Sequence, residues 1–172
     1  MKTIKSHVSK QATSLLDITF WSNMVVIALV VVINAINLFR SAAQQDDLIE
    51  IASPEFVVVV SVILCVWMAV RALSAIFTKR RLKSVYVSLT EDGVEGVSMP
   101  EPMSGRKGES FSLAYREITD VHRVEVPITR RNPVPSLRIG NSEEGYTIPA
   151  PEQMDELILL ISERMPGASA HR

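Results

Sequence analysis

The chain has 172 residues, 47% of them hydrophobic, and a formal net charge of −1; this length predicts one domain, or one domain with an appendage. The charge is divided unevenly, because residues 1–83 hold nine Lys and Arg against five Asp and Glu (+4), whereas residues 84–172 hold nine against fourteen (−5). A chain divided in this way does not resemble a nucleic-acid-binding protein, which needs a basic face on its folded domain. The single cysteine, Cys65, excludes a disulfide framework, a CxxC redox motif or a thiolate metal cluster within one chain.

Two apolar runs dominate the first half. Phe20–Phe39 contains no charged residue, and Phe56–Phe77 contains only Arg71. A helix needs about 20 residues to cross a hydrocarbon core of about 30 Å, so each run predicts a membrane span. The alternative, two buried helices of a soluble core, is disfavoured because neither run keeps a polar face for water. The start of the chain, Met1–Gln11, is polar and carries lysines, unlike a secretory signal peptide.

The flanks of the two spans predict their direction. Basic residues precede the first span and follow the second, while the connecting segment 40–55 has one base and four acids. The positive-inside rule therefore places both termini in the cytoplasm and the protein in a plasma or inner membrane. The expected organisation is a cytoplasmic segment 1–19, a membrane hairpin 20–83 with a basic juxtamembrane end, a cytoplasmic domain 84–165 and a flexible tail 166–172.

Polar and small residues repeat along the spans. Asn23 and Asn34 lie almost on one line of the first helix, and the second carries a heptad stripe of mostly small residues. Such stripes favour close helix packing in lipid, either within the hairpin or between copies of the chain. The candidate interface consists of Asn23, Asn34, Asn37, Ser61, Cys65 and Ala72. Arg71 lies about two turns from the cytoplasmic end, so we expect its stem to carry the guanidinium to the headgroups rather than to serve an ion path or a partner.

From Ser84 the hydrophobic period changes to two. The alternation predicts a hairpin over 84–99 around the turn Thr90–Gly93, a loop at 100–109, strands at 110–115 and 117–126, a proline-rich loop at 127–135, and a last hairpin over 136–149. Pro151–Met165 reads as an amphipathic helix opened by Pro151. The predicted class is therefore α+β.

The order of these elements resembles the bacterial PH-like domain family. The residues that carry the resemblance, over about 84–165, are Tyr86, Leu89, Thr90, Gly93 and Val94, followed by Tyr115, Glu117, Ile118 and Val121. The resemblance implies a small antiparallel β sandwich or partial barrel capped by the C-terminal helix. A full version has seven strands, and the segment 84–165 is short for that number. The family has no single activity, so the resemblance informs the fold more than the function.

The sequence offers no catalytic or metal-ligating constellation, and we expect neither an enzyme nor a cofactor. The three histidines have no partner at metal-ligand spacing, and His122 alternates with valines as a solvent-facing strand residue does. The loop SGRKGES (104–110) lacks the Walker spacing and the strand-then-helix context of a phosphate loop. Two spans also make a poor transport pathway unless many copies assemble.

Recognition is the remaining class of function. The favoured hypothesis is a non-enzymatic scaffold for a protein partner or for self-assembly; the alternative is a sensor of anionic lipid headgroups or a small ligand. The candidate lipid or topology residues are Lys79, Arg80, Arg81, Lys83, Arg106 and Lys107. Arg130 and Arg131 are candidate partner contacts. The bases of the cluster 79–83 are explained more simply as a mark of the cytoplasmic end of the second span than as a headgroup site, because the domain that follows them is acidic.

Overall fold

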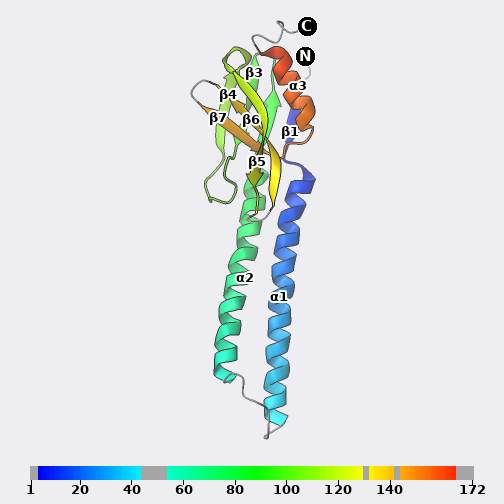
Figure 1. The fold of residues 1–172 in the computed structure, drawn as a ribbon, viewed down its shortest axis with the longest axis vertical. Helices are drawn as coiled ribbons and strands as arrows, with labels where there is room; N and C mark the ends of the chain where they lie inside the picture. Colours follow the sequence, from blue (N-terminus) through cyan, green and yellow to red (C-terminus); the bar gives the residue numbers. More distant parts are fainter. Residues whose placement is uncertain (1–3, 44–53, 130–131, 142–143, 166–172) are drawn as a thin grey trace. The chain divides into compact units, whose positions relative to one another are not determined.

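The computed structural model describes residues 4–43, 54–129, 132–141 and 144–165. Its chain forms two compact units, one made of residues 1–16 and 77–172, hereafter the β module, and one made of residues 17–76, hereafter the hairpin unit. Two long helices, two antiparallel sheets and a C-terminal helix make up the described chain (Figure 1), so the expected α+β class is confirmed. The predicted acidic turn between the spans and the tail 166–172 lie largely or wholly outside the described residues.

Helices α1 (Lys10–Ala43) and α2 (Pro54–Leu82) contain the two predicted spans. Both are long and apolar enough to cross a membrane. Their side chains are mostly exposed apolar groups, such as Trp21 at 65% and Ile63 at 64%. Large apolar side chains on the outside of a helix pair are suited to hydrocarbon rather than to water.

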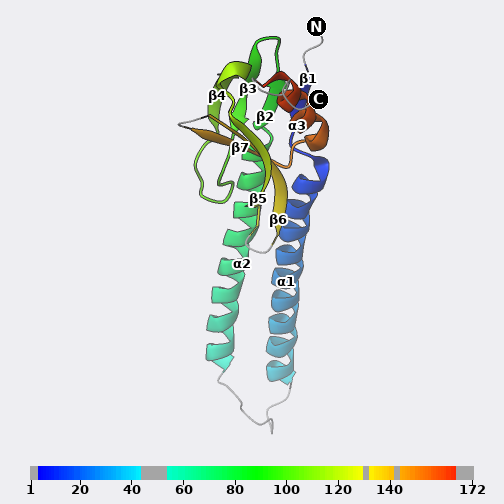
Figure 2. The ribbon, with the colours of Figure 1, turned by 45° about the horizontal axis from the view of Figure 1, so that its top comes forward.

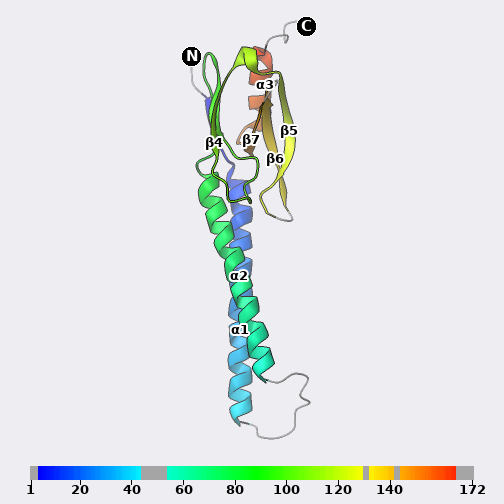
Figure 3. The same cartoon turned by 90° about the vertical axis from the view of Figure 1, so that its left-hand side faces the viewer.

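The β module consists of two sheets and a helix. One sheet has the order β1-β2-β3-β4, formed by β1 (Ile4–His7), β2 (Tyr86–Leu89), β3 (Gly93–Ser98) and β4 (Glu109–Ala114). The 3₁₀ turn η1 (Tyr115–Glu117) leads to the second sheet, of order β5-β6-β7, with β5 (Asp120–Pro127), β6 (Pro133–Gly140) and β7 (Gly145–Pro149). Figure 3 shows the two sheets as separate layers, and α3 (Met154–Arg164) follows the last strand.

The first strand of the module comes from before the membrane hairpin. β1 pairs antiparallel with β2, with Ile4 opposite Leu89 and His7 opposite Tyr86. It is tied on its other side to the segment before α3, because Val8 bridges Pro151 and the amide of Ser9 donates to the carbonyl of Ala150 at 2.8 Å. The sequence pattern predicts no strand in this segment. The described residues of the module therefore form seven strands, and the hairpin is inserted in the sequence between the first and the second of them.

Two local expectations were wrong. Pro133 and Pro135 belong to β6, the central strand, rather than to a loop. The pairing of β6 with β7 begins only at Ser136, so at the two prolines β5 is the single neighbour of β6. On the unpaired side of the strand no backbone N–H is needed, and proline, which has none, is tolerated there. Pro151 does not open the helix, because the bridge to Val8 holds it extended and α3 begins at Met154.

The core of the module lies between the sheets and under α3. Its fully buried side chains include Val87 and Val94 from the first sheet, Leu137 and Ile148 from the second, and Ile161 from α3. The predicted apolar face of the last helix is the face that packs, since Leu157 and Ile161 are buried while Leu159 is 58% exposed. Phe111 and Tyr146 stack across the two sheets with ring centroids 4.7 Å apart. The sandwich is thus closed by one continuous set of apolar contacts.

Candidate functional site

The last turn of α2 gathers basic residues for a local reason. Lys79, Arg80 and Arg81 occupy this turn, and Lys83 follows it. Cations at the C-terminus of a helix face its unpaired carbonyls and the negative end of its dipole. The amide of Ser84 donates to the carbonyl of Arg81 at 3.0 Å, which ends the helix and turns the chain into β2. The basic cluster is therefore stabilising for the helix end whatever else it does.

A loop of residues 99–108, hereafter the β3–β4 loop, extends beside this turn. It is anchored at its start by Met99, whose amide donates to the carbonyl of Thr147 at 2.8 Å, and Pro102 is buried. Its middle is a hydrogen-bonded turn in which the amide of Ser104 donates to the carbonyl of Glu101 at 3.0 Å. Gly105 follows with φ of +81°, a conformation that favours glycine. The loop runs alongside the end of α2 in all three ribbon views (Figures 1–3).

The structure brings the two predicted basic segments together. A Cβ placed on Gly105 would stand 3.5 Å from Nη1 of Arg81, so the guanidinium lies against the turn that carries Arg106 and Lys107. Arg106, Lys107, Arg80 and Lys83 are exposed and Arg81 is half-buried. Among the described residues, none of these five groups has a carboxylate within 4.0 Å.

Met103 is a residue of this region that the sequence analysis missed. Outside α1 and α2, only Met103, at 43%, and Leu159 are exposed large apolar side chains in the described part of the chain. The signal was present in the sequence, as an apolar residue three positions before two bases in a loop of Pro, Gly and Ser. Folding places it at the end of the module that also holds Arg81. This end therefore combines positive charge with an exposed apolar group.

The predicted helix–helix residues meet within the hairpin unit. Nδ2 of Asn34 donates to Oγ of Ser61 at 2.9 Å, across the two helices. Because α1 and α2 run in opposite directions, the residue eleven positions before Asn34 lies at the same level as the residue eleven positions after Ser61. These two residues are Asn23 and Ala72, and both are buried, with 5% and 3% of their surface exposed. Cys65 is half-buried, whereas Asn37 is exposed. The two stripes thus face each other inside one chain.

Arg71 behaves differently from the expectation. Its guanidinium carbon lies 5.2 Å from the ring centroid of Trp67, one turn back toward the middle of α2. The side chain is therefore not extended toward Lys79 and the end of the span. A guanidinium over an indole face gains a cation–π interaction, which is stronger where water is scarce.

The remaining predicted residues fall outside this region or outside the described chain. Arg130 and Arg131 are not among the described residues. His122 is solvent-facing, as expected, and its Nδ1 lies 2.7 Å from a carboxylate oxygen of Asp120. At the opposite end of the module, Nη1 of Arg164 donates to Oη of Tyr115 at 2.7 Å and to the carbonyl of Thr90 at 3.2 Å. This contact fastens α3 to the turn Thr90–Gly93.

Among the titratable groups of the described residues, only the phenol of Tyr146 has a clearly shifted pKa. Its hydroxyl donates to a carboxylate oxygen of Glu144. This hydrogen bond, with burial of the phenol and the negative charges of Glu144 and Glu109, raises the pKa of Tyr146 to about 12. The phenol is therefore kept protonated, which suits a structural donor rather than a base.

Within residues 4–43, 54–129, 132–141 and 144–165, no group of three or more His, Cys, Asp or Glu could hold a metal ion. Comparisons with family models, with curated proteins and with solved structures gave no match to this chain. The geometry alone therefore carries the functional argument.

Proposed function

We propose that this chain is a non-enzymatic membrane protein of two spans, whose β module lies on the cytoplasmic face of a plasma or inner membrane. The module scaffolds a protein partner or the assembly of several copies, and it belongs to the bacterial PH-like group. The four-plus-three sheet arrangement with a C-terminal helix supports that grouping.

The pairing of β1 with β2 is the observation that carries the proposal. These strands precede α1 and follow α2, and they register residue by residue from Ile4–Leu89 to His7–Tyr86. Two segments that share a sheet lie on one side of a membrane, so a hairpin that enters the bilayer between them must return to the side from which it started. The bases around both helix ends favour the cytoplasm as that side.

The double attachment also supports a scaffold. β1 ends at His7 and α1 begins at Lys10, while α2 ends at Leu82 and β2 begins at Tyr86. Such short connections attach the module to the two helices at two points, without a long linker. A module attached in this way stays near the membrane, where it is available to partners in the cytoplasm. Strand β5 is an edge strand of its sheet and offers backbone groups for such an interaction.

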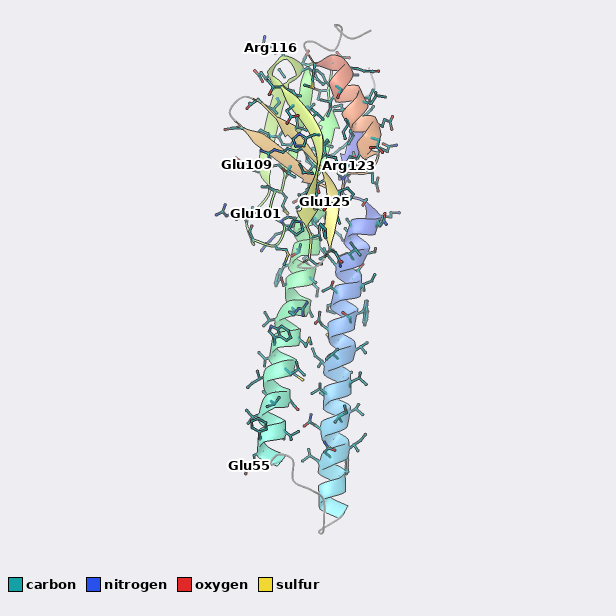
Figure 4. All side chains as sticks on the ribbon, in the orientation of Figure 1. Glu55, Glu101, Glu109, Arg116, Arg123 and Glu125 are labelled. Carbon is teal, nitrogen blue, oxygen red and sulfur yellow. The ribbon has the colours of Figure 1, made fainter. Side chains whose placement is uncertain are left out.

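The test uses the full chain, because residues 84–165 alone lack β1. Tags at both ends are probed with an impermeant reagent in intact cells, and a photo-crosslinking residue replaces Glu125 on the exposed part of β5. Figure 4 labels Glu125 on this strand, and Arg116, at the far end of the module, supplies the control position. We expect both ends to be protected and Glu125 to give one discrete crosslinked species. Labelling of either end from outside, or a chain that is always monomeric and uncrosslinked, contradicts the proposal.

The second candidate is recognition of anionic headgroups or a small ligand. The observation that favours it is the contact of Arg81 with the turn at Gly105, which joins two basic segments that are separate in the sequence. The acidic total of residues 84–172 argues against this candidate only if the charge is spread evenly. Arg81, Arg106 and Lys107 gather at one end of the module, and among the described residues none of the three has a carboxylate within 4.0 Å.

A further inference from the structure

We propose that the β3–β4 loop is a second membrane contact of the module, in which Met103 enters the interface of the bilayer and Arg81, Arg106 and Lys107 bind the phosphates of anionic lipid headgroups. This inference rests on the proposed two-span placement and concerns lipids of the same bilayer. It assigns a ligand class, phosphate-bearing headgroups, to a part of the module that the scaffold hypothesis leaves unused.

The first step is the position of the loop along α2. Phe77 is the last residue of the apolar run, and Arg81 follows four residues later on the same unbroken helix. At about 1.5 Å per residue, Arg81 stands roughly 6 Å beyond Phe77. With Phe77 at the edge of the hydrocarbon core, Arg81 lies at the depth of the headgroup layer. Since Gly105 lies against the Arg81 guanidinium, the tip of the loop shares that depth.

The second step is the chemistry of the tip. An exposed apolar side chain in water is unfavourable, and membrane-interfacial segments combine such groups with Lys and Arg. Met103 is 43% exposed, and Arg106 and Lys107 follow it within four residues, all exposed. Leu159, the other exposed apolar side chain outside α1 and α2 in the described chain, belongs to α3, where Asp155, Glu156 and Glu163 surround it in sequence. The loop alone therefore pairs an apolar group with positive charge.

The third step is electrostatic. Arg81, Arg106 and Lys107 have no carboxylate within 4.0 Å among the described residues, so their charge is available to a phosphate. Glu101, in the same loop, is exposed and reduces the net charge by one. Acids at the far end of the module lie beyond the screening length of about 8 Å at physiological ionic strength and have little effect on the headgroup layer. An arginine also binds phosphate through two parallel N–H donors.

The experiment measures the depth of the loop in the full chain. A spin label is placed at Met103→Cys in a Cys65→Ser background, and the protein is reconstituted in phosphatidylcholine vesicles with or without phosphatidylglycerol. Collision rates with oxygen, which partitions into lipid, and with a water-soluble nickel chelate report where the label lies. We expect the label to move into the interface when phosphatidylglycerol is present and to be released at high salt. A label at Leu159→Cys serves as the control and stays in water in both membranes.

A matched pair of substitutions tests the headgroup contacts. Arg106→Gln should weaken the preference for phosphatidylglycerol about fivefold, the effect of one basic residue at an anionic surface, whereas Arg116→Gln should leave it unchanged. Figure 4 labels Arg116 at the end of the module away from the last turn of α2, so this variant changes the net charge equally without touching the loop. Neither residue adjoins a span, and both variants are therefore expected to keep the orientation of the hairpin.

Three outcomes overturn the inference. These are a label at 103 that stays in water in both membranes, equal effects of Arg106→Gln and Arg116→Gln, or release of the loop from phosphatidylglycerol vesicles by inorganic phosphate that clearly exceeds the release by chloride at the same ionic strength. The last result would make free phosphate the ligand in place of the lipid. Vesicles contain no partner protein, so a negative result here leaves the scaffold function standing. Outside labelling of the termini would instead remove the proposed function first.

Discussion

The amide of Glu152 donates a hydrogen bond to the carbonyl oxygen of His7, with 2.8 Å between the nitrogen and the oxygen. This bond joins the segment before α1 to the segment before α3, and the hydroxyl of Ser6 donates to the carbonyl of Glu152 beside it. Two segments that are far apart in the sequence, one before α1 and one before α3, are thus held together within the β module. β1 thereby joins β2 to the segment that precedes the last helix of the module.

Ser6→Ala should destabilise the β module. Ser6 is 3% exposed, and loss of its hydroxyl leaves the carbonyl of Glu152 without this donor. Such a change lowers the free energy of unfolding by about 1–3 kcal/mol. Hydrogen exchange of the β2 amides in the full chain measures the effect. Ser14→Ala is the control, since its exposed hydroxyl bonds only within the first turns of α1, and an equal loss in both variants would contradict the role given to β1.

Asn34 and Ser61 should be energetically coupled. Their hydrogen bond crosses the hairpin at 2.9 Å. Polar contacts between helices in lipid are worth about 0.6–2 kcal/mol. A double-mutant cycle of Asn34→Leu and Ser61→Ala, measured by unfolding in mixed micelles, should give a coupling free energy in that range. Asn37→Leu with Ser61→Ala provides the comparison, because Asn37 is exposed, and should be additive.

Gly96→Ala should be poorly tolerated in β3. A Cβ at this position would stand 2.3 Å from the carbonyl oxygen of Tyr86 in the neighbouring strand, so the backbone itself must move. Overpacking of this kind lowers the free energy of unfolding by about 1–3 kcal/mol. At Gly140 the nearest atom would be 3.5 Å away, an ordinary contact. Thermal unfolding of the two variants should therefore differ, and equal melting temperatures would show that β3 relaxes more easily than its register suggests.

Stability should fall as the pH rises from about 10 to about 12. The pKa of Tyr146 is raised in the fold to about 12 from its ordinary value of 10.0. The unfolded chain therefore loses this proton first, and the stabilising effect, complete below pH 10, disappears as the pH approaches 12. Phenolate absorbance of the native protein, compared with Tyr146→Phe, measures the titration. The Glu144→Gln substitution weakens the hydrogen bond that is the main cause of the raised pKa, so the pKa of Tyr146 should return toward 10.0. A titration that this substitution leaves unchanged would show that Glu144 is not the cause.

Much of the architecture was predictable because it depends on local pattern. The length and apolarity of α1 and α2, the alternation along β2, β3 and β7, and the buried Leu157–Ile161 face of α3 follow from periods of 3.6 and 2. The missed strand Ile4–His7 has four residues and no apolar alternation, and its partner lies beyond two helices. No short-range signal identifies such a strand. The same applies to Pro133 and Pro135, whose place in β6 depends on where the pairing with β7 begins.

The sequence by itself determined two helices able to span a membrane, an α+β module beyond them, and the asymmetry of charge around the helix ends, because hydrophobic period and charge are properties of neighbouring residues. Only the tertiary structure decided that the module is split around the hairpin, that Asn34 meets Ser61, and that Arg81 lies against the loop with Met103, Arg106 and Lys107. These are contacts between segments far apart in the chain, and they arise when the two sheets and α3 bury a common core.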